Sequence, residues 1–125
     1  MSGNKGIERP MSTFSEAEVE FLAENFIGRL ATSSPDGQPH VVPVGYEFDG
    51  TTVTFSGRNL VKSLKFKNLM ANAKVAFVVD DLVSTSPWKV RGVEIRGRAE
   101  PSFSKEGVTT VRIVPVNIRS WGVED

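Results

Sequence analysis

One stretch of the chain, FSGRNLVKSLK at 55–65, holds the side chains best suited to binding an anion. A predicted strand ends there, a glycine follows, and a predicted helix begins near Leu60. Helix N-termini present free backbone amides and a partial positive charge to anions. Arg58, Lys62 and Lys65 add full charges, and the last two are three positions apart, which places them on one face of a helix. The pattern predicts an anchor for a phosphate or another anion, although a basic helix that faces solvent fits it equally well.

A second segment, VVPVGY at 41–46, places a proline and a glycine inside a predicted strand. Pro43 cannot donate to a sheet ladder, and Gly45 has no side chain to pack. Together with the intervening Val44, they indicate that something other than a neighbouring strand lies against this backbone. A flat ligand ring is one candidate, and an ordinary edge strand with a bulge is the other.

Trp88 and Arg91 lie where a predicted loop, 81–89, leads into the next strand. An exposed tryptophan can form the wall of a ligand site or anchor an interface. The arginine can bind an anion. A tryptophan that packs within its own loop is the alternative to both functions.

Few side chains could supply acid–base chemistry. His40 is the only histidine and Tyr46 the only tyrosine, and each is a weak candidate for a proton donor. Without cysteine, thiolate catalysis and cysteine-ligated metals are excluded, and a single histidine excludes a multi-histidine metal site, so we expect no metal. Glycine-rich dinucleotide and P-loop motifs are also missing. If the protein is an enzyme, a bound cofactor supplies the chemistry and the catalytic side chains stay unassigned.

Composition limits the remaining possibilities. The chain has 125 residues, which suits one domain at 13–125 behind a polar, disordered leader at 1–12. Lys plus Arg and Asp plus Glu are both 15, so the zero net charge gives no support for a nucleic-acid or membrane-surface partner. No apolar run approaches the roughly 18 residues of a membrane span, and the N-terminus lacks a signal-peptide pattern. We expect a cytoplasmic protein, with Met1 or Met11 as its native start.

Apolar periodicity predicts two helices and six strands. The helices are 16–25, which begins with a capping box, and 60–71, which Asn59 caps. A bend is expected at Pro115 in the last strand. Short turns join several strands, which predicts an antiparallel barrel or sandwich with the helices packed outside. The predicted strands are 27–32, 40–48, 51–56, 74–80, 90–100 and 108–121.

Several segments, in this order and spacing, resemble the pyridoxamine 5′-phosphate oxidase-like split β-barrel family. Two further segments, EIRGRAE at 94–100 and SWG at 120–122, are similar to its small branch of deazaflavin-dependent enzymes. The resemblance covers about 14 to 124. The segments that carry it are RLAT at 29–32, PDGQP at 35–39, VVPV at 41–44, KSLKFKNL at 62–69 and VAFVV at 75–79.

The resemblance implies a mainly β fold, a six-stranded antiparallel split β-barrel with about two outer helices. It also implies a homodimer that holds a flavin or deazaflavin at each subunit interface. The strand at 41–46 would lie along the tricyclic ring, and the basic strand-to-helix segment would hold the phosphate. Trp88 and Arg91 would reach the partner subunit's site. The residues implied in cofactor binding within one subunit are Pro43, Val44, Gly45, Ser56, Arg58, Lys62, Ser63 and Lys65.

The function that follows is an oxidoreductase that transfers a hydride from reduced coenzyme F-420, a deazaflavin, to a small unsaturated organic substrate. An FMN-binding oxidoreductase on the same fold is the first alternative, because FMN also has one phosphate. A non-catalytic carrier of a cofactor, haem or another planar ligand is the second. Members of the family that form pyridoxal phosphate have a larger basic and histidine set, which this chain lacks, so vitamin B6 oxidation is not expected.

Overall fold

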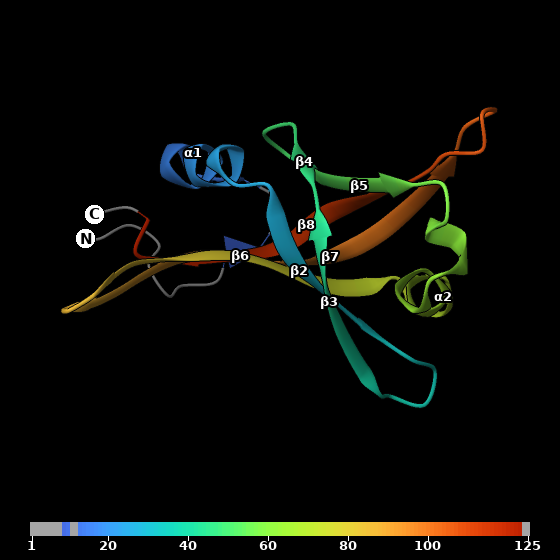
Figure 1. Cartoon of the computed structure of the whole chain (residues 1–125), viewed down its shortest axis with the longest axis horizontal. Helices are drawn as coiled ribbons and strands as arrows, with labels where there is room; N and C mark the ends of the chain where they lie inside the picture. The colour runs from blue at the N-terminus through green and yellow to red at the C-terminus, as the bar shows by residue number, and fades with distance from the viewer. Residues whose placement is uncertain (1–8, 11–12, 124–125) are drawn as a thin grey trace.

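The computed structural model of the chain describes residues 9–10 and 13–123 (Figure 1). Two α-helices and a short 3-10 turn, η1, accompany the strands in this part of the chain. In chain order the elements are β1 (Arg9–Pro10), α1 (Glu16–Glu24), β2 (Ile27–Ser33), β3 (Pro39–Gly45), β4 (Glu47–Phe48), β5 (Val53–Gly57), η1 (Leu60–Lys62), α2 (Leu64–Ala71), β6 (Lys74–Thr85), β7 (Trp88–Phe103) and β8 (Thr109–Trp121).

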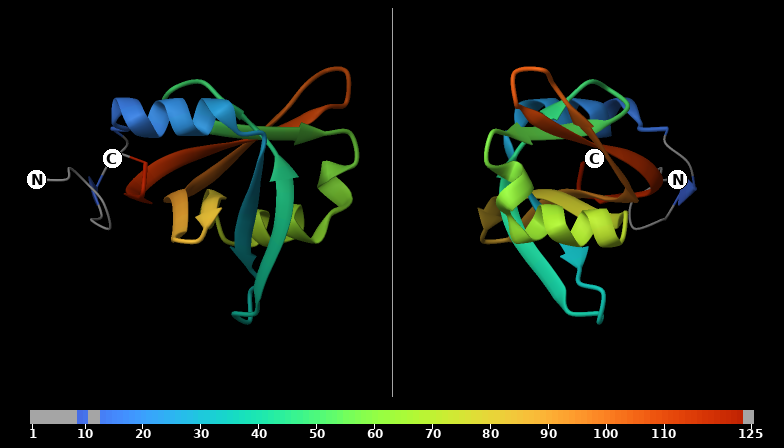
Figure 2. Two further views of the ribbon diagram at one scale, coloured as in Figure 1. Left: turned by 60° about the vertical axis from the view of Figure 1, so that its left-hand side comes forward. Right: turned by 90° about the vertical axis from the view of Figure 1, so that its right-hand side faces the viewer.

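The strands form one antiparallel sheet that curls without closing. Its hydrogen-bonded order is β3-β2-β6-β7-β8-β5-β4, with β1 paired to β8 beside this path. Strand β3 pairs only with β2, and β5 pairs with β4 and β8, so the described strands leave an opening between β3 and β5. Figure 2 shows the two helices outside the strands, far from each other. The predicted mainly β, antiparallel split barrel with two outer helices is confirmed.

The strand count differs from the prediction at one place. The second predicted strand, 40–48, divides at Tyr46 into β3 and β4, so seven strands rather than six form the described path. At the break, the Tyr46 amide donates to the carbonyl of Phe26 at 3.0 Å instead of joining a ladder. The predicted leader falls mostly outside the described residues. The two that are described, Arg9 and Pro10, pair with β8 opposite Ile118 and Asn117.

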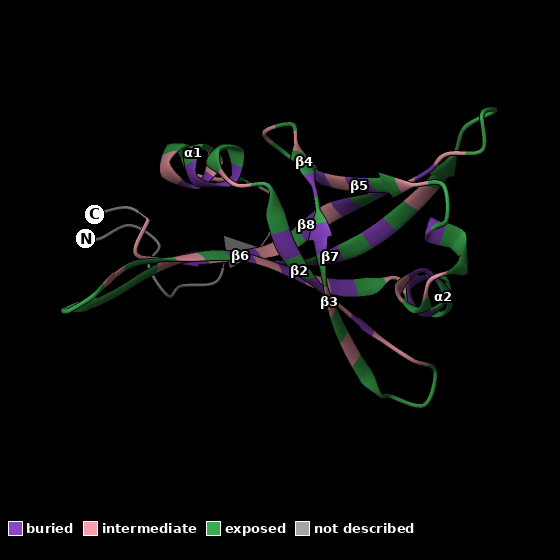
Figure 3. Ribbon diagram, viewed as in Figure 1, coloured by how far each residue is buried: buried purple, intermediate pink, exposed green. Residues whose placement is uncertain are grey.

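Burial alternates along the strands, as a sheet with one buried face requires (Figure 3). In β2 every second residue turns inward, with Leu30 fully buried at the centre. The tip of the Phe77 ring on β6 lies against Gly28, where an added Cβ would come within 2.2 Å of it. The largest fully buried apolar side chains are Phe21, Phe77, Leu22, Leu30, Ile95, Ile113, Ile118, Val53, Val79, Val93 and Val111.

Helix α1 begins as predicted. The Ser15 hydroxyl accepts from the Glu18 amide at 3.1 Å, and the Glu18 carboxylate accepts from the Ser15 amide at 2.9 Å. The second carboxylate oxygen of Glu18 accepts from the Ser120 hydroxyl at 2.5 Å, which ties the helix start to β8 inside the core. In the part of the chain that the structure describes, neither helix is long and apolar enough to cross a membrane.

The second predicted helix, 60–71, is wrong in its first turn. Residues Leu60–Lys62 form the 3-10 turn η1, Ser63 is extended with a ψ of 155°, and the α-helix begins only at Leu64. Ser63 is therefore the N-cap of α2, whereas the Asn59 side chain makes no capping hydrogen bond. A serine hydroxyl favours the N-cap position because it can bond a free backbone amide at a helix start. The 3-10 turn therefore ends before Ser63, and a separate α-helix begins after it.

The predicted loop at 81–89 is also wrong, because β6 and β7 extend into a long hairpin joined at Ser86 and Pro87. The pairing continues through Asp81 opposite Arg91 to Thr85 opposite Trp88. This hairpin projects from the body of the molecule, and most of its far end is exposed (Figure 3).

Candidate functional site

A cleft of about 340 Å³ lies at the opening of the barrel, between the free edge of β3, the end of β5 and the start of α2. A smaller hollow of about 210 Å³ continues it along β5 towards Glu47 and shares Gly45, Phe55 and Ser56 with it. The cleft is lined by Pro43, Val44, Gly45, Phe55, Ser56, Gly57, Asn59, Leu60 and Lys65.

Strand β3 forms one wall of this cleft. It is the last strand of the path and pairs with β2 in an unbroken register from Ile27–Gly45 to Ser33–Pro39. A proline at position 43 is tolerated because β3 is an edge strand, where a backbone N–H on the free side has no neighbouring strand to bond. A Cβ added at Gly45 would meet only the carbonyl oxygen of Phe26, at 3.7 Å, so the space beside this glycine is open. The wall is thus a bare backbone strip that a flat molecule can approach.

The opposite wall comes from β5 and η1. Phe55 and Leu60 are buried and give the cleft an apolar side. The Ser56 hydroxyl lies 3.1 Å from that of Thr110 on β8, which fixes its position at the rim. The predicted site includes Ser56 but misses four other lining residues, which are Phe55, Gly57, Asn59 and Leu60. Their signal was the glycine after an alternating strand, which allows the backbone to turn towards β3.

Lys65 is the cation that the fold brings to the cleft. It belongs to the first turn of α2 and is half-buried, whereas Lys62 and Lys67 are exposed. Two contacts hold this helix start in place. The Ser63 hydroxyl accepts from the Phe66 amide at 3.2 Å and donates to the Leu60 carbonyl at 2.6 Å. Further along, the buried Asn68 amide donates to the Thr32 hydroxyl at 3.1 Å and binds α2 to β2.

The other predicted cations lie elsewhere. Lys62 sits on η1, and because the chain breaks at Ser63, its spacing from Lys65 does not place the two on one helix face. Arg58 donates to the carbonyl of Glu106 at 2.9 Å, in the turn between β7 and β8. Neither residue lines the cleft.

Trp88 and Arg91 lie on the β6–β7 hairpin and outside the cleft. Arg91 donates to both carboxylate oxygens of Asp81, at 3.0 and 2.5 Å, which raises the pKa of the guanidinium. Its guanidinium carbon is also 5.0 Å from the centre of the Phe21 ring. Trp88 is 68% exposed, so it does not pack within a loop.

The two weak proton-donor candidates do not face the cleft with their titrating groups. The Tyr46 hydroxyl donates to the carbonyl of Leu22 at 2.7 Å inside the core. His40 stands at the far end of β3, opposite Thr32, and its Nδ1 is buried without a hydrogen-bond partner among the described residues. Neither side chain is placed to protonate a substrate held in the cleft.

The position of the Tyr46 hydroxyl gives a prediction that needs no variant, because the chain has one tyrosine. Burial raises the pKa of Tyr46 to about 12, against about 10 in an unfolded chain. The free energy of unfolding should therefore be unaffected by this group below pH 10 and should fall as the pH rises from about 10 to about 12. Tyrosinate absorbance should titrate near 12 in the folded protein. A folded-state midpoint near 10 would mean that the hydroxyl is solvent-accessible.

The cap of α2 gives a second prediction. Replacing Ser63 with alanine removes both hydroxyl contacts and should lower the free energy of unfolding by about 1 kcal/mol. Urea denaturation measures this loss, with Ser102→Ala on the exposed face of β7 as the control. Equal stability of the two variants would show that the hydroxyl does not hold the helix start.

The fold and the cleft define an antiparallel split-barrel protein with a cleft at the split. The pyridoxamine 5′-phosphate oxidase family model matches residues 14–114. A 5a,11a-dehydrotetracycline/5a,11a-dehydrooxytetracycline reductase of Streptomyces rimosus is 39% identical over 120 residues, which covers 89% of this chain and 84% of the relative. The chain therefore belongs to the pyridoxamine 5′-phosphate oxidase family, and it is an oxidoreductase, as the sequence predicts.

Solved structures agree on the fold. A conserved hypothetical protein of Mycobacterium tuberculosis has a TM-score of 0.74 with 28% identity, covering 91% of this chain and 88% of that protein. A protein named F420 reductase has a TM-score of 0.67 with 24% identity, covering 84% of this chain and 98% of the other. An FAD-binding protein of Mesorhizobium loti has a TM-score of 0.68 with 22% identity, covering 91% and 96%.

Proposed function

We propose that the protein transfers a hydride from the reduced deazaflavin coenzyme F-420 to a small unsaturated organic substrate. The observation that carries the proposal is the cleft, where a half-buried lysine at a helix start lies across from a bare edge strand. The names of two relatives support it: one is an F420 reductase and the other a dehydrotetracycline reductase. When bound, the reduced deazaflavin ring supplies the hydride.

The residues of the cleft fit an anionic tail. The first backbone hydrogen bond of α2 runs from the Lys67 amide to the Ser63 carbonyl, at 3.1 Å. The Phe66 amide donates to the Ser63 hydroxyl instead. The amides of Leu64 and Lys65 therefore stay available to an anion in the described structure. Added to the Lys65 ammonium, they make the helix start suitable for one phosphate. Lys62, Arg58 and Ser63 contribute less directly, through long-range charge and through the cap.

The residues of the cleft also fit a planar ring. Pro43, Val44 and Gly45 offer a strip of backbone with open space beside the glycine. A ring edge can pair with free polar groups of this strip, as peptides do at a sheet edge. Phe55 and Leu60 exclude water from the other side. No side chain of the cleft is a clear proton donor, so the proton is proposed to come from solvent.

The cleft is open on one side, and we propose that a second copy of the chain covers it in a homodimer. Phe26 and Ile27 lie beside Gly45 and are 75% and 60% exposed, and Val41 on β3 is 66% exposed. Large apolar side chains gathered at a ligand site indicate an interface. In this arrangement Trp88, at the tip of its hairpin, and Arg91 reach towards the partner subunit's cleft. Light scattering should give the mass of a dimer.

FMN is the alternative cofactor, because Lys65 and the helix start would bind its single phosphate equally well. A haem carrier is less favoured, since His40 does not line the cleft and the Tyr46 hydroxyl faces the core. The cytoplasmic location also stays a prediction.

Binding of the two cofactors tests the proposal. Purified protein is titrated with F-420 and with FMN, and then supplied with the reduced form of the tighter ligand and an enone. The proposal expects tighter binding of F-420 and oxidation of the reduced cofactor that depends on the enone. Tighter binding of FMN would mean that the cofactor is the flavin and not F-420. Binding of a cofactor without turnover would mean that the protein is a non-catalytic carrier.

A further inference from the structure

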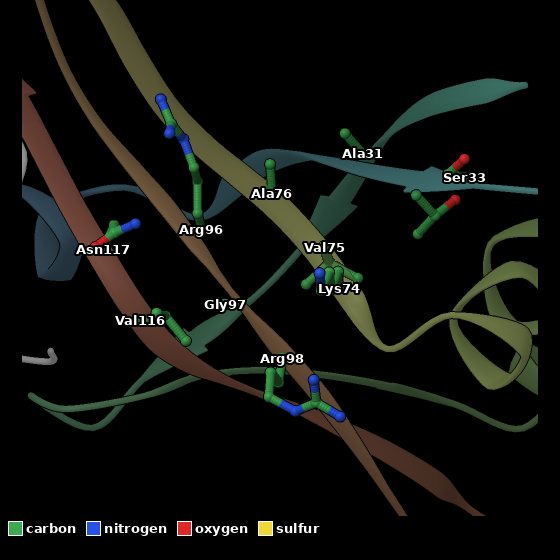
Figure 4. A pocket seen from close by; sticks show the side chains of 11 residues that line it. Ala31, Ser33, Lys74, Val75, Ala76, Arg96, Gly97, Arg98, Val116 and Asn117 are labelled. Atoms are coloured by element: carbon green, nitrogen blue, oxygen red, sulfur yellow. The ribbon is translucent and has the colours of Figure 1, made fainter. Parts of the chain in front are cut away.

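A groove of about 590 Å³ lies over β2, β6, β7 and β8 and shares no lining residue with the cleft (Figure 4). Ala31, which lines this groove, stands directly opposite Val41 on β3. Val41 belongs to the exposed apolar surface that a second copy covers in the proposed homodimer. We therefore assign this groove to the dimer surface and not to a small ligand.

The smaller hollow that continues the cleft is different, because polar side chains gather in it. Glu47 on β4 stands directly opposite Thr54 on β5, and both line the hollow. Ser56, which also lines it, is two residues further along β5, so its side chain lies on the same face of the sheet as that of Thr54. The hollow therefore presents one carboxylate and two hydroxyl groups on one face.

These polar groups have unused hydrogen-bonding capacity. In the described part of the chain, neither the Glu47 carboxylate nor the Thr54 hydroxyl has a hydrogen-bond or ion-pair partner. The Ser56 hydroxyl shares one hydrogen bond with that of Thr110 and can form another. The hollow thus offers an acceptor and two potential donors to a ligand.

Neighbouring carboxylates on this side of the sheet are bonded within the protein. Asp49, in the β4–β5 turn, accepts from two backbone amides at 2.8 and 2.6 Å. Glu100 on β7 accepts from Arg112 on β8 at 2.8 Å. Because Arg112 stands opposite Thr54 on its other side, the cation nearest to Glu47 in the strand register is already paired. The fold therefore leaves the Glu47 carboxylate free beside the ligand cleft.

The hollow lies at the opposite end of the cleft from the proposed phosphate anchor. Lys65 lines the cleft where β5 ends at Gly57. Thr54 precedes Gly57 by three residues, which is about 10 Å along an extended strand. A cofactor that binds Lys65 with its phosphate and lies along β3 therefore extends its ring into the hollow.

The chemistry of the hollow decides which end of the ring enters it. In both F-420 and FMN the phosphate-bearing chain is attached to the central ring, so either outer ring could point towards Glu47. The pyrimidine end has an imide N–H between two carbonyl groups, which complements a carboxylate acceptor and two hydroxyl donors. The benzenoid end has methyl groups in FMN and a single hydroxyl group in F-420. Methyl groups there would cover the charge of Glu47 without a hydrogen bond, which is costly.

We propose that the hollow binds the pyrimidine end of the cofactor ring, with the Glu47 carboxylate accepting from the imide N–H and the Thr54 and Ser56 hydroxyls donating to the carbonyl groups beside it. Glu47 then sets the orientation of the ring along β3, which is a role separate from the phosphate contact at Lys65. This inference rests on the cofactor binding proposed for the cleft. It applies to F-420 and FMN alike, because both rings have the imide.

The test measures dissociation constants for F-420, FMN and deaza-FMN, and for deaza-FMN methylated at the imide nitrogen, from the change in probe fluorescence as protein is added. Glu47→Ala removes the acceptor, and Thr54→Val replaces the hydroxyl by a methyl group. Glu20→Ala removes the same charge from an exposed position on α1, outside the cleft and the hollow, and is the matched control. Lys65→Ala reports separately on the phosphate anchor.

Glu47→Ala should bind the cofactors about tenfold more weakly than the parent protein, as the loss of a charge-assisted hydrogen bond implies. The direction is informative, because a carboxylate that merely repels the anionic cofactor would give tighter binding when removed. Thr54→Val should lose several-fold in affinity, and Glu20→Ala should stay within about twofold of the parent.

The methylated probe needs no variant, so it tests the contact even if Glu47→Ala is unstable. Methylation should weaken binding to the parent protein by about tenfold, because it removes the N–H that Glu47 accepts. In Glu47→Ala it should change the affinity by less than about twofold, since the contact is already gone.

The inference is overturned if Glu47→Ala binds the cofactors as tightly as the parent or more tightly, or if the parent binds the methylated and unmethylated probes equally. Binding that still depends on Lys65 in that case would uphold the cofactor cleft and show that the ring is turned the other way. A parent protein that binds none of the cofactors, or binds them independently of Lys65, would instead overturn the proposed function together with this inference.

Discussion

Replacing Lys65 with alanine should weaken the binding of a phosphorylated deazaflavin or flavin by at least about tenfold. Lys65 is the half-buried cation of the cleft, and a charge-assisted hydrogen bond contributes about 1.5–3 kcal/mol. The loss should appear in the dissociation constant of F-420, measured by the change in its fluorescence as protein is added. The fold should be unaffected, because the ammonium has no hydrogen bond to the described residues.

Two variants of neighbouring lysines make the Lys65 result specific. Lys67→Ala changes an exposed lysine on the same helix that does not line the cleft, and it should leave the affinity within about twofold. Lys62→Ala should lie between the two, since Lys62 is exposed on η1 and acts only through its charge. Equal losses of cofactor affinity in all three variants would mean that the general positive charge of this region, and not a specific contact with Lys65, binds the anion.

The largest expected effect on stability comes from Phe77→Ala, which should lower the free energy of unfolding by about 3–5 kcal/mol. The Phe77 ring is 1% exposed, lies over Gly28 and meets the ring of Tyr46 edge-on at a centroid distance of 5.3 Å. Its removal leaves a cavity at the junction of β2, β3 and β6. Gly28, which lies against the ring, has no side chain that could fill the space.

Phe103→Ala is the matched control for the Phe77 variant. Phe103 is 64% exposed near the end of β7 and makes only an edge contact with Phe66, at 6.3 Å between ring centres. Its loss should cost less than about 1 kcal/mol. Denaturation in urea, with both variants and the parent protein at equal concentration, measures the difference. Similar losses in the two variants would contradict the assignment of the core.

Features that depend on neighbouring residues could be predicted from the sequence. The capping box at Ser15 and Glu18 needs only residues three apart, and the structure confirms it. Most strand cores, such as 27–32 and 51–56, follow from alternation alone. The bend expected at Pro115 has a counterpart in the register shift of β8 at the next residue, Val116.

Features set by pairing across the molecule could not be predicted in this way. The 81–89 segment reads as a loop by composition, but Asp81 facing Arg91 and Thr85 facing Trp88 continue the ladder to its tip. Similarly, the break at Ser63 depends on a hydroxyl that bonds both the Leu60 carbonyl and the Phe66 amide. Periodicity of apolar residues carries no information about such contacts.

The candidate site shows the same division. Pro43, Val44, Gly45, Ser56 and Lys65 line one cleft, because each belongs to an element that the sequence locates. Arg58 and Lys62 do not line the cleft, since their directions depend on the turn at η1 and on the Glu106 carbonyl.

A crystal structure of the protein with F-420 bound tests the central claim most directly. The account predicts the phosphate within hydrogen-bond distance of the Lys65 ammonium at the start of α2, and the ring along the β3 strip from Pro43 to Gly45. A phosphate bound at any other place on the chain, with the cleft at the barrel opening left empty, would contradict it.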